Sequence, residues 1–212
     1  MTVADIGAGT GLLTRDLLPR FAHVFAVEPN EEMRSALVSN EIGSHPSLRA
    51  LSGTAESTSL ADSSVDMVFA AQAFHWFDIV SARAEFQRVL RGPRAVALFW
   101  NTRKVGVSRG ADELDAVMDS LRTGERKTLA ADEAAVSAFF GAGSWKRAEY
   151  PNPMSLSRDE LRSMVLSRSY APRAGDSGYE GLVTRLDKLF GAYSIGEHFV
   201  IPQVTEVYLG RL

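Results

Sequence analysis

A glycine-rich stretch near the start of the chain constrains the fold most. The apolar residues 3–6 run directly into residues 7–11, whose sequence is GAGTG. Alternating glycines let the backbone turn tightly after a strand and leave no side chain between the main chain and a ligand. Leu13 and Leu17 then share one face of a predicted helix, which Pro19 ends. The N–H groups that begin such a helix favour an electronegative ligand group.

Strands and helices alternate over the first hundred residues. Further strands are predicted at 24–27, 48–51, 65–70 and 95–100, and the last helix of the series at 80–90. This order predicts an α/β fold, a Rossmann-like, doubly wound and mostly parallel sheet of seven strands with helices on both faces. A final strand at about 204–209 is expected to lie antiparallel at an edge of the sheet, because Pro202 before it cannot donate to a ladder.

The alternation ends after Asn101. Helices are expected at 114–121 and 130–140, and a strand near 145–150. Ser157 and Ser177 each precede a glutamate by three residues, which is the capping-box pattern and predicts two further helix starts.

Composition excludes several classes of protein. The chain has no cysteine, so it can form neither disulfides nor thiolate metal sites and has no cysteine nucleophile. Its histidines show no metal-ligand spacing, and no metal is expected. A formal net charge of -3 argues against nucleic acid as the main partner. Because no apolar run reaches membrane-spanning length and the first residues do not read as a signal peptide, no membrane association is expected and the cytoplasm is the default location.

An acidic residue, Glu28, ends the second predicted strand. A carboxylate there can accept hydrogen bonds from both hydroxyls of a ribose, and the alternative is a solvated glutamate at a helix start. The dinucleotide fingerprint G-x-G-x-x-G would require glycine at position 12, where the chain has Leu12. Asp5 lies two residues before the first glycine and can help to hold an ammonium group. The spacing therefore favours S-adenosylmethionine over a nicotinamide dinucleotide.

Four stretches together resemble the class I S-adenosylmethionine-dependent methyltransferases. Residues 3–11 resemble motif I, 26–33 the acidic loop and its helix, 53–56 the loop that lines the adenine, and 65–78 the motif after the fourth strand. Within the class, the chain is most similar to the type 11 methyltransferase domain and the trans-aconitate methyltransferase-like enzymes. The resemblance implies S-adenosylmethionine as cofactor and methyl transfer to a small molecule, with a small carboxylate as the expected acceptor.

The resemblance also implies a domain layout and a set of site residues. We expect one methyltransferase domain over 1–212, with a cofactor-binding half at 1–101 and an acceptor-side half at 102–212. The implied cofactor-binding residues are Asp5, Gly7, Gly9, Gly11, Glu28, Ala55, Glu56 and Gln72. The expected residues of the acceptor pocket are Trp76, Asn101, Arg168 and Tyr170.

Two residues, His75 and Arg168, are expected to act on the acceptor. His75 follows the fourth strand, where an open α/β sheet presents its ligand crevice, and is the candidate general base. Its alternative roles are lining the pocket without proton transfer and packing among the neighbouring aromatic residues. Arg168 can clamp a carboxylate, whereas the structural alternative is an arginine stabilised by the dipole at a helix C-terminus.

The chain departs from the family pattern in two places. Thr54 stands where relatives often carry an aspartate that accepts from the adenine amino group, so either the Thr54 hydroxyl or Glu56 is expected to make this contact. Relatives also carry helices ahead of motif I, and these lid helices are expected to be missing here, which leaves a homodimer as one way to cover the site. The alternative functions are a non-catalytic binding protein with the methyltransferase fold and, less favoured, a nicotinamide-dependent oxidoreductase.

Overall fold

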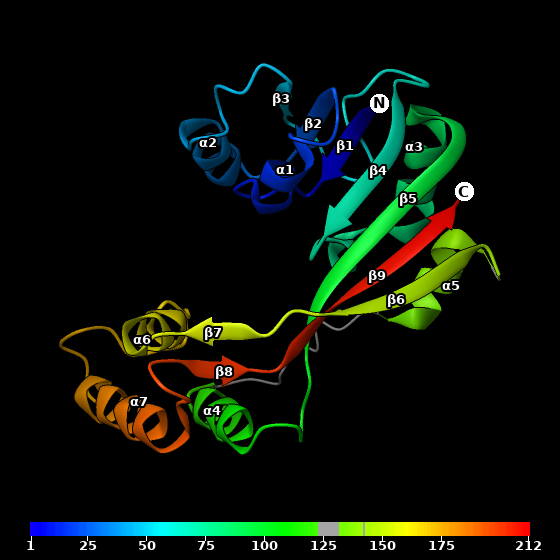
Figure 1. Ribbon diagram of the computed structural model, residues 1–212. Coiled ribbons are helices and arrows are strands. Elements are labelled where there is room, and N and C mark those ends of the chain that lie inside the picture. The colour runs from blue at the N-terminus through cyan, green and yellow to red at the C-terminus, as the bar shows by residue number, and fades with distance from the viewer. Residues whose placement is uncertain (123–131, 142) are drawn as a thin grey trace. The chain divides into compact units, whose positions relative to one another are not determined.

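The computed structural model of the protein describes residues 1–122, 132–141 and 143–212 (Figure 1). The first part of the chain forms β1 (Thr2–Ile6), α1 (Leu12–Leu17), β2 (His23–Val27), α2 (Glu31–Ser39), β3 (Leu48–Leu51), β4 (Val65–Ala71), the 3-10 turn η1 (Phe74–Trp76), α3 (Ile79–Val89) and β5 (Leu90–Arg103). The later part forms α4 (Arg109–Ser120), α5 (Glu133–Phe140), β6 (Trp145–Pro151), β7 (Met154–Leu156), α6 (Arg158–Leu166), α7 (Tyr179–Tyr193), β8 (Phe199–Ile201) and β9 (Gln203–Arg211).

Seven strands form one sheet in the order β3-β2-β1-β4-β5-β9-β6. The pairs β1–β2, β2–β3, β1–β4 and β4–β5 are all parallel. The arrow of β9 runs against that of β4 (Figure 1). The predicted doubly wound, mostly parallel sheet is therefore confirmed. Because the parallel strands point the same way, the residues that follow β1, β2, β3 and β4 share one edge of the sheet, which is where open α/β sheets bind ligands.

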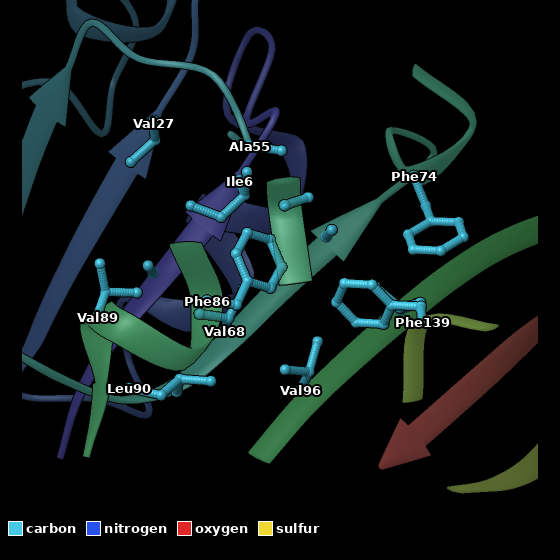
Figure 2. Packing of buried hydrophobic residues seen from close by; sticks show 14 of the residues in the cluster. Ile6, Val27, Ala55, Val68, Phe74, Phe86, Val89, Leu90, Val96 and Phe139 are labelled. Carbon is cyan, nitrogen blue, oxygen red and sulfur yellow. The ribbon is translucent and has the colours of Figure 1, made fainter. Parts of the chain in front are cut away.

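Helices cover both faces of this sheet, as predicted. Alternate residues of each strand point to opposite faces. On one face, Val68 and Val96 join a buried cluster with Phe86 of α3 and Phe139 of α5, and Figure 2 shows these rings packed between the helices and the strands. On the other face, strand residues pack against the buried leucines of α1 and α2 in a second cluster. Burial of these apolar side chains is the main source of the sheet's stability.

The predicted edge position of the last strand is wrong. Strand β9 lies between β5 and β6, and β6 forms the edge of the sheet. Pro202 precedes β9 and lies outside the ladder, so it sets no limit on where the strand pairs. The exposed, charged sequence of β6 suits an edge instead, because polar side chains protect an unpaired edge from other strands.

Of the two predicted capping boxes, only the first is present. Ser157 accepts from the N–H of Glu160, whose carboxylate accepts from Ser157 in return. Helix α7 starts one residue later than Ser177 predicts, because Gly178, with φ of 95°, takes the N-cap position. The predicted helix 130–140 begins in part outside the described residues, and α5 starts at Glu133.

The described residues divide into two compact units. The first contains residues 1–100, 206–212 and the described part of 132–149, and the second contains 101–122 and 150–205. The second unit has a core of its own, in which α4, α6 and α7 pack together, and a two-stranded antiparallel sheet of β7 and β8. One methyltransferase domain with halves meeting at residue 101 stays a prediction. Within the described residues, no helix is long and apolar enough to cross a bilayer, and no three acidic or histidine side chains gather as metal ligands would.

Candidate functional site

The glycine loop between β1 and α1 depends on left-handed backbone conformations. Gly7, Gly9 and Gly11 have φ of 71°, 57° and 90°. A Cβ atom on Gly7 would lie 2.5 Å from the Cβ of Ala73, so the loop and the segment after β4 are in close contact. A Cβ on Gly9 would meet no atom within 4 Å. The middle of the loop therefore leaves free space over its main chain, as a cofactor site requires.

Glu28 holds the carboxylate of the site at the end of β2. Its side chain is only 6% exposed. One carboxylate oxygen accepts from the N–H of Gly9 at 2.8 Å, and the other accepts from the N–H of Asn30 at 2.9 Å. Because a carboxylate oxygen has two acceptor positions, each oxygen keeps one for a further donor. The backbone N–H of Glu28 donates to the carbonyl oxygen of Leu51 at 3.0 Å, which ties the end of β2 to the end of β3.

Asp5 lies under the loop and is 1% exposed. Its carboxylate accepts from the hydroxyl of Thr14 at 2.6 Å, and Thr14 is itself fully buried in α1. Burial raises the pKa of Asp5 to about 6, while the bond from Thr14 opposes the rise and the negative charge of Glu28 adds to it. The observed partner of Asp5 is thus a helix residue that fixes α1 against β1.

Gln72 is the first residue after β4. It is a non-glycine residue with φ of 55°, and its N–H donates to the carbonyl oxygen of Phe99 at 2.9 Å. A left-handed conformation in a residue with a side chain costs energy and is concentrated at functional sites. Gln72 is exposed, so its side-chain amide is accessible to a ligand.

The loop after β3 carries the residues expected to line the adenine. Ala55 is buried and joins the cluster that contains Ile6 and Phe86 (Figure 2). Glu56 is half-buried, and its carboxylate accepts from the N–H of Asp78 at 2.9 Å. Thr54 is exposed, and its N–H donates to the carbonyl oxygen of Ser57 at 3.0 Å.

His75 and Trp76 lie in η1 after β4. Both side chains are exposed, Trp76 to 77%, and their ring centroids are 5.0 Å apart. Partial desolvation lowers the pKa of His75, so the imidazole is neutral at pH 7. Phe74 of the same turn points inward instead and packs edge-on against Trp100. The exposed pair is therefore available to a ligand, and its role stays a prediction.

The other three expected acceptor residues lie in the second unit. Asn101 accepts from the hydroxyl of Thr205 at 2.8 Å. Tyr170 is half-buried, and the guanidinium of Arg122 lies 4.9 Å from the centre of its ring. Arg168 is exposed just after α6. Asn101 and Tyr170 thus have structural partners, and the acceptor-pocket role of all three residues stays a prediction.

The residues of the first unit fit S-adenosylmethionine. The buried carboxylate of Glu28 keeps two acceptor positions, which match the two hydroxyls of a ribose. The open space over Gly9 leaves the backbone of the loop accessible. A cavity of about 310 Å³ lies between the start of α1 and the end of α2. Gly11 of the loop lines this cavity, whereas Asp5, Glu28 and Gln72 do not.

Two residues that support the site were not identified from the sequence. Thr14 pairs with Asp5, and Glu85 of α3 accepts from Thr58 in the loop after β3. A signal existed for Thr14, because it is a polar residue one turn before Leu17 and Leu18 on the buried face of α1. For Glu85 the sequence offered none, since its partner is 27 residues away.

Comparisons with known proteins bear on the family and the fold of this chain. A family model described as a methyltransferase domain matches residues 4–94. An uncharacterised methyltransferase of Mycobacterium bovis is 48% identical over 101 residues, which is 48% of this chain and 40% of the relative. The chain thus matches less than half the length of that relative. An uncharacterised methyltransferase-like protein of Schizosaccharomyces pombe is 27% identical over 188 residues, covering 88% of this chain and 72% of the relative.

A solved structure shares the fold. The protein from Anaeromyxobacter dehalogenans, assigned as a type II methyltransferase, superimposes with a TM-score of 0.66 at 24% identity, over 99% of this chain and 89% of the other. The predicted family is confirmed, although the trans-aconitate-like subtype is not. Residues 4–94 thus match a methyltransferase domain and the chain shares the fold of a solved methyltransferase, which supports a class I S-adenosylmethionine-dependent methyltransferase.

Proposed function

We propose that this chain binds S-adenosylmethionine at the carboxyl edge of the sheet and transfers its methyl group to a small molecule. The observation that carries the proposal is the bond from the Gly9 N–H to the buried carboxylate of Glu28. It joins the left-handed glycine loop to an acid that keeps acceptor positions for a ribose. This bond therefore holds the glycine loop and the carboxylate of Glu28, the two parts of a nucleoside-type site, next to each other.

Each cofactor-site residue has a role in this proposal. Glu28 accepts from the ribose hydroxyls, Ala55 and Glu56 flank the adenine, and the backbone at Gln72 meets the methionine end. Asp5 helps to hold the ammonium group, directly or through water. When bound, the cofactor supplies a methyl group made electrophilic by a positively charged sulfur. The residues around it contribute by positioning the reactants and excluding water.

For the acceptor we propose a small carboxylate, by analogy with the enzymes that the chain resembles. A carboxylate is already nucleophilic and needs no base. The exposed guanidinium of Arg168 is a group that pairs well with a carboxylate. If the acceptor is a phenol or an amine, His75 serves as the base, because an imidazole that is neutral at pH 7 can accept its proton.

The experiment is calorimetric titration with S-adenosylhomocysteine, with NAD as a parallel ligand. Glu28→Ala is compared with Glu31→Ala, which removes an exposed carboxylate from the first turn of α2. We expect micromolar binding of S-adenosylhomocysteine, and a loss of about tenfold or more in Glu28→Ala, the equivalent of one or two hydrogen bonds to a charged group. Glu31→Ala should bind as the wild type does. Transfer of a labelled methyl group to a panel of carboxylates, phenols and amines then tests the activity.

The outcomes separate the alternatives. Binding of NAD alone would contradict the proposal and favour an oxidoreductase. Binding of S-adenosylhomocysteine without transfer to any class of acceptor would favour a non-catalytic protein with the methyltransferase fold. Loss of binding in Glu31→Ala as well would show that net charge, rather than Glu28, decides affinity.

We also propose the cytoplasm as the location, and a small molecule rather than nucleic acid or a membrane as the partner. The net charge of -3 supports the choice against nucleic acid. A homodimer stays a prediction, which light scattering of the purified protein tests.

A further inference from the structure

The loop that follows β3 is fastened to helix α3 at three points. At the start of the helix, the N–H of Asp78 donates to Glu56 of the loop at 2.9 Å. In its second turn, Glu85 accepts from Thr58 of the loop. One residue before its end, Arg88 donates to the carbonyl oxygen of Leu60 at 2.8 Å. The loop thus follows the helix along most of its length.

Glu85 is the central point of this attachment. It is only 9% exposed, and one carboxylate oxygen accepts from both the N–H and the hydroxyl of Thr58, at 2.8 Å and 2.6 Å. The guanidinium of Arg88 donates to both oxygens, at 2.8 Å and 2.7 Å. These donors lower the pKa of Glu85 to about 2, so the carboxylate is charged at neutral pH. Bonds to a charged acceptor are the stronger kind, and Thr58 is fully buried.

The loop attached to α3 begins next to Glu28, the residue proposed to bind the ribose. Glu28 donates its N–H to Leu51, the last residue of β3, and the loop begins at the next residue. Within the loop, Thr54 and Ser57 exchange backbone hydrogen bonds, so Ala55 and Glu56 sit in a closed turn just before Thr58. A displacement of Thr58 would therefore move this turn relative to Glu28.

We propose that Glu85 is a positioning residue of the cofactor site. Through Thr58 it holds the turn at Ala55 and Glu56 against the adenine, although it does not touch the cofactor itself. This inference rests on the proposed function, because it gives a role to a loop whose ligand is S-adenosylmethionine.

The test compares two ligands that differ in the adenine. S-adenosylhomocysteine carries the base, and S-ribosylhomocysteine has the same ribose and amino acid without it. The dissociation constant of S-ribosylhomocysteine divided by that of S-adenosylhomocysteine measures what the adenine contributes to affinity. We expect Glu85→Gln, which keeps the size of the side chain and removes its charge, to reduce this ratio about tenfold. A variant that only lowers the fraction of folded protein would weaken both ligands equally and leave the ratio unchanged.

Three further variants complete the design. Thr58→Val removes the hydroxyl and should reduce the ratio as Glu85→Gln does, while Thr58→Ser keeps the hydroxyl and should restore it. Asp66→Asn is the matched control. Asp66 also accepts from a backbone N–H and an arginine, but it lies at the amino end of β4 and outside the turn at 54–57, so this variant should leave the ratio at the wild-type value. Hydrogen exchange of the amides at 54–58 in the free protein should quicken in Glu85→Gln and Thr58→Val alone.

An unchanged ratio in folded Glu85→Gln, or an equal loss for both ligands, would overturn the inference and leave the proposed function intact. If Glu85→Gln does not fold, the contrast between Thr58→Val and Thr58→Ser decides in the same way. Failure of the wild type to bind S-adenosylhomocysteine would instead overturn the proposed function, and the inference with it.

Discussion

Gly7 and Gly9 have similar backbone conformations and different surroundings. Alanine at either position must adopt a left-handed φ, which costs about 1–2 kcal/mol. At Gly7 the added Cβ would also lie 2.5 Å from Ala73, and forcing such overlap costs roughly 1–3 kcal/mol more. We therefore expect Gly7→Ala to lower the free energy of unfolding more than Gly9→Ala. Urea unfolding followed by tryptophan fluorescence measures both, and equal losses would show that Ala73 yields.

The same pair of variants separates folding from binding. The Cβ of Gly9→Ala would point into open space beside the loop, where we propose that the cofactor binds. Gly9→Ala should therefore be the more stable of the two variants, but its affinity for S-adenosylhomocysteine should be lower than that of the wild type. The glycine pattern could be read from the sequence, because left-handed turns leave a signature in composition. Which glycine contacts Ala73 could not, since that contact joins segments more than sixty residues apart in the chain.

Asp5 makes stability depend on pH in a direction that can be worked out. Its pKa is about 6 in the folded protein and near 3.8 in an unfolded chain, so the folded state binds the proton more tightly. Its contribution to stability is therefore present below about pH 4 and is lost as pH rises through about 6. The difference amounts to about 3 kcal/mol by pH 7.

Asp5→Asn removes this titration. We expect the variant to gain stability relative to the wild type as pH rises from 4 to 7, whatever constant offset the amide introduces. Urea unfolding of both proteins across this range measures the gain. A constant difference would show that Thr14 already keeps Asp5 ionised, as its hydrogen bond tends to do.

At the scale of elements, two serines with the same local sequence pattern should behave differently. Ser157 caps α6 through a reciprocal bond with Glu160, and losing such a cap costs about 1 kcal/mol. Ser177 stands before Gly178, which occupies the N-cap of α7. We expect Ser157→Ala to speed hydrogen exchange in α6 and Ser177→Ala to leave α7 unchanged. Equal effects would mean that Ser177 supports α7 in solution.

The elements also show where sequence reasoning stops. The buried strands and their helices could be predicted, because each carries its own apolar pattern. The place of β9 could not, since a strand's own sequence does not say which neighbour it pairs with. The short strands β7 and β8 were not predicted for a related reason. Three residues are too few to show the alternation of a strand, and the two strands pair across more than forty residues of chain. The same holds for the candidate site. Glu28 could be predicted from the sequence around it, whereas the role of Glu85 depends on a partner 27 residues away.

In the molecule as a whole, each unit has a hydrophobic cluster made up of its own residues alone. The residues of the proposed cofactor site, from Asp5 to Gln72, all belong to the first unit. All three tryptophans, Trp76, Trp100 and Trp145, also belong to it, so fluorescence reports on this unit alone. A ligand stabilises the cooperative unit that binds it, by about 2.7 kcal/mol at a hundred times its dissociation constant.

S-adenosylhomocysteine should therefore stabilise one unit and leave the other unchanged. We expect it to raise the urea midpoint seen by fluorescence and to slow hydrogen exchange in β1 and β4. Exchange at the buried leucines of α7, Leu182, Leu186 and Leu189, should be the same with and without the ligand. Equal protection of α7 would contradict this and show that the two clusters unfold together. The free energy of binding would then be shared across the chain, and variants in the second unit, such as Ser157→Ala, would weaken affinity for a ligand that they do not touch.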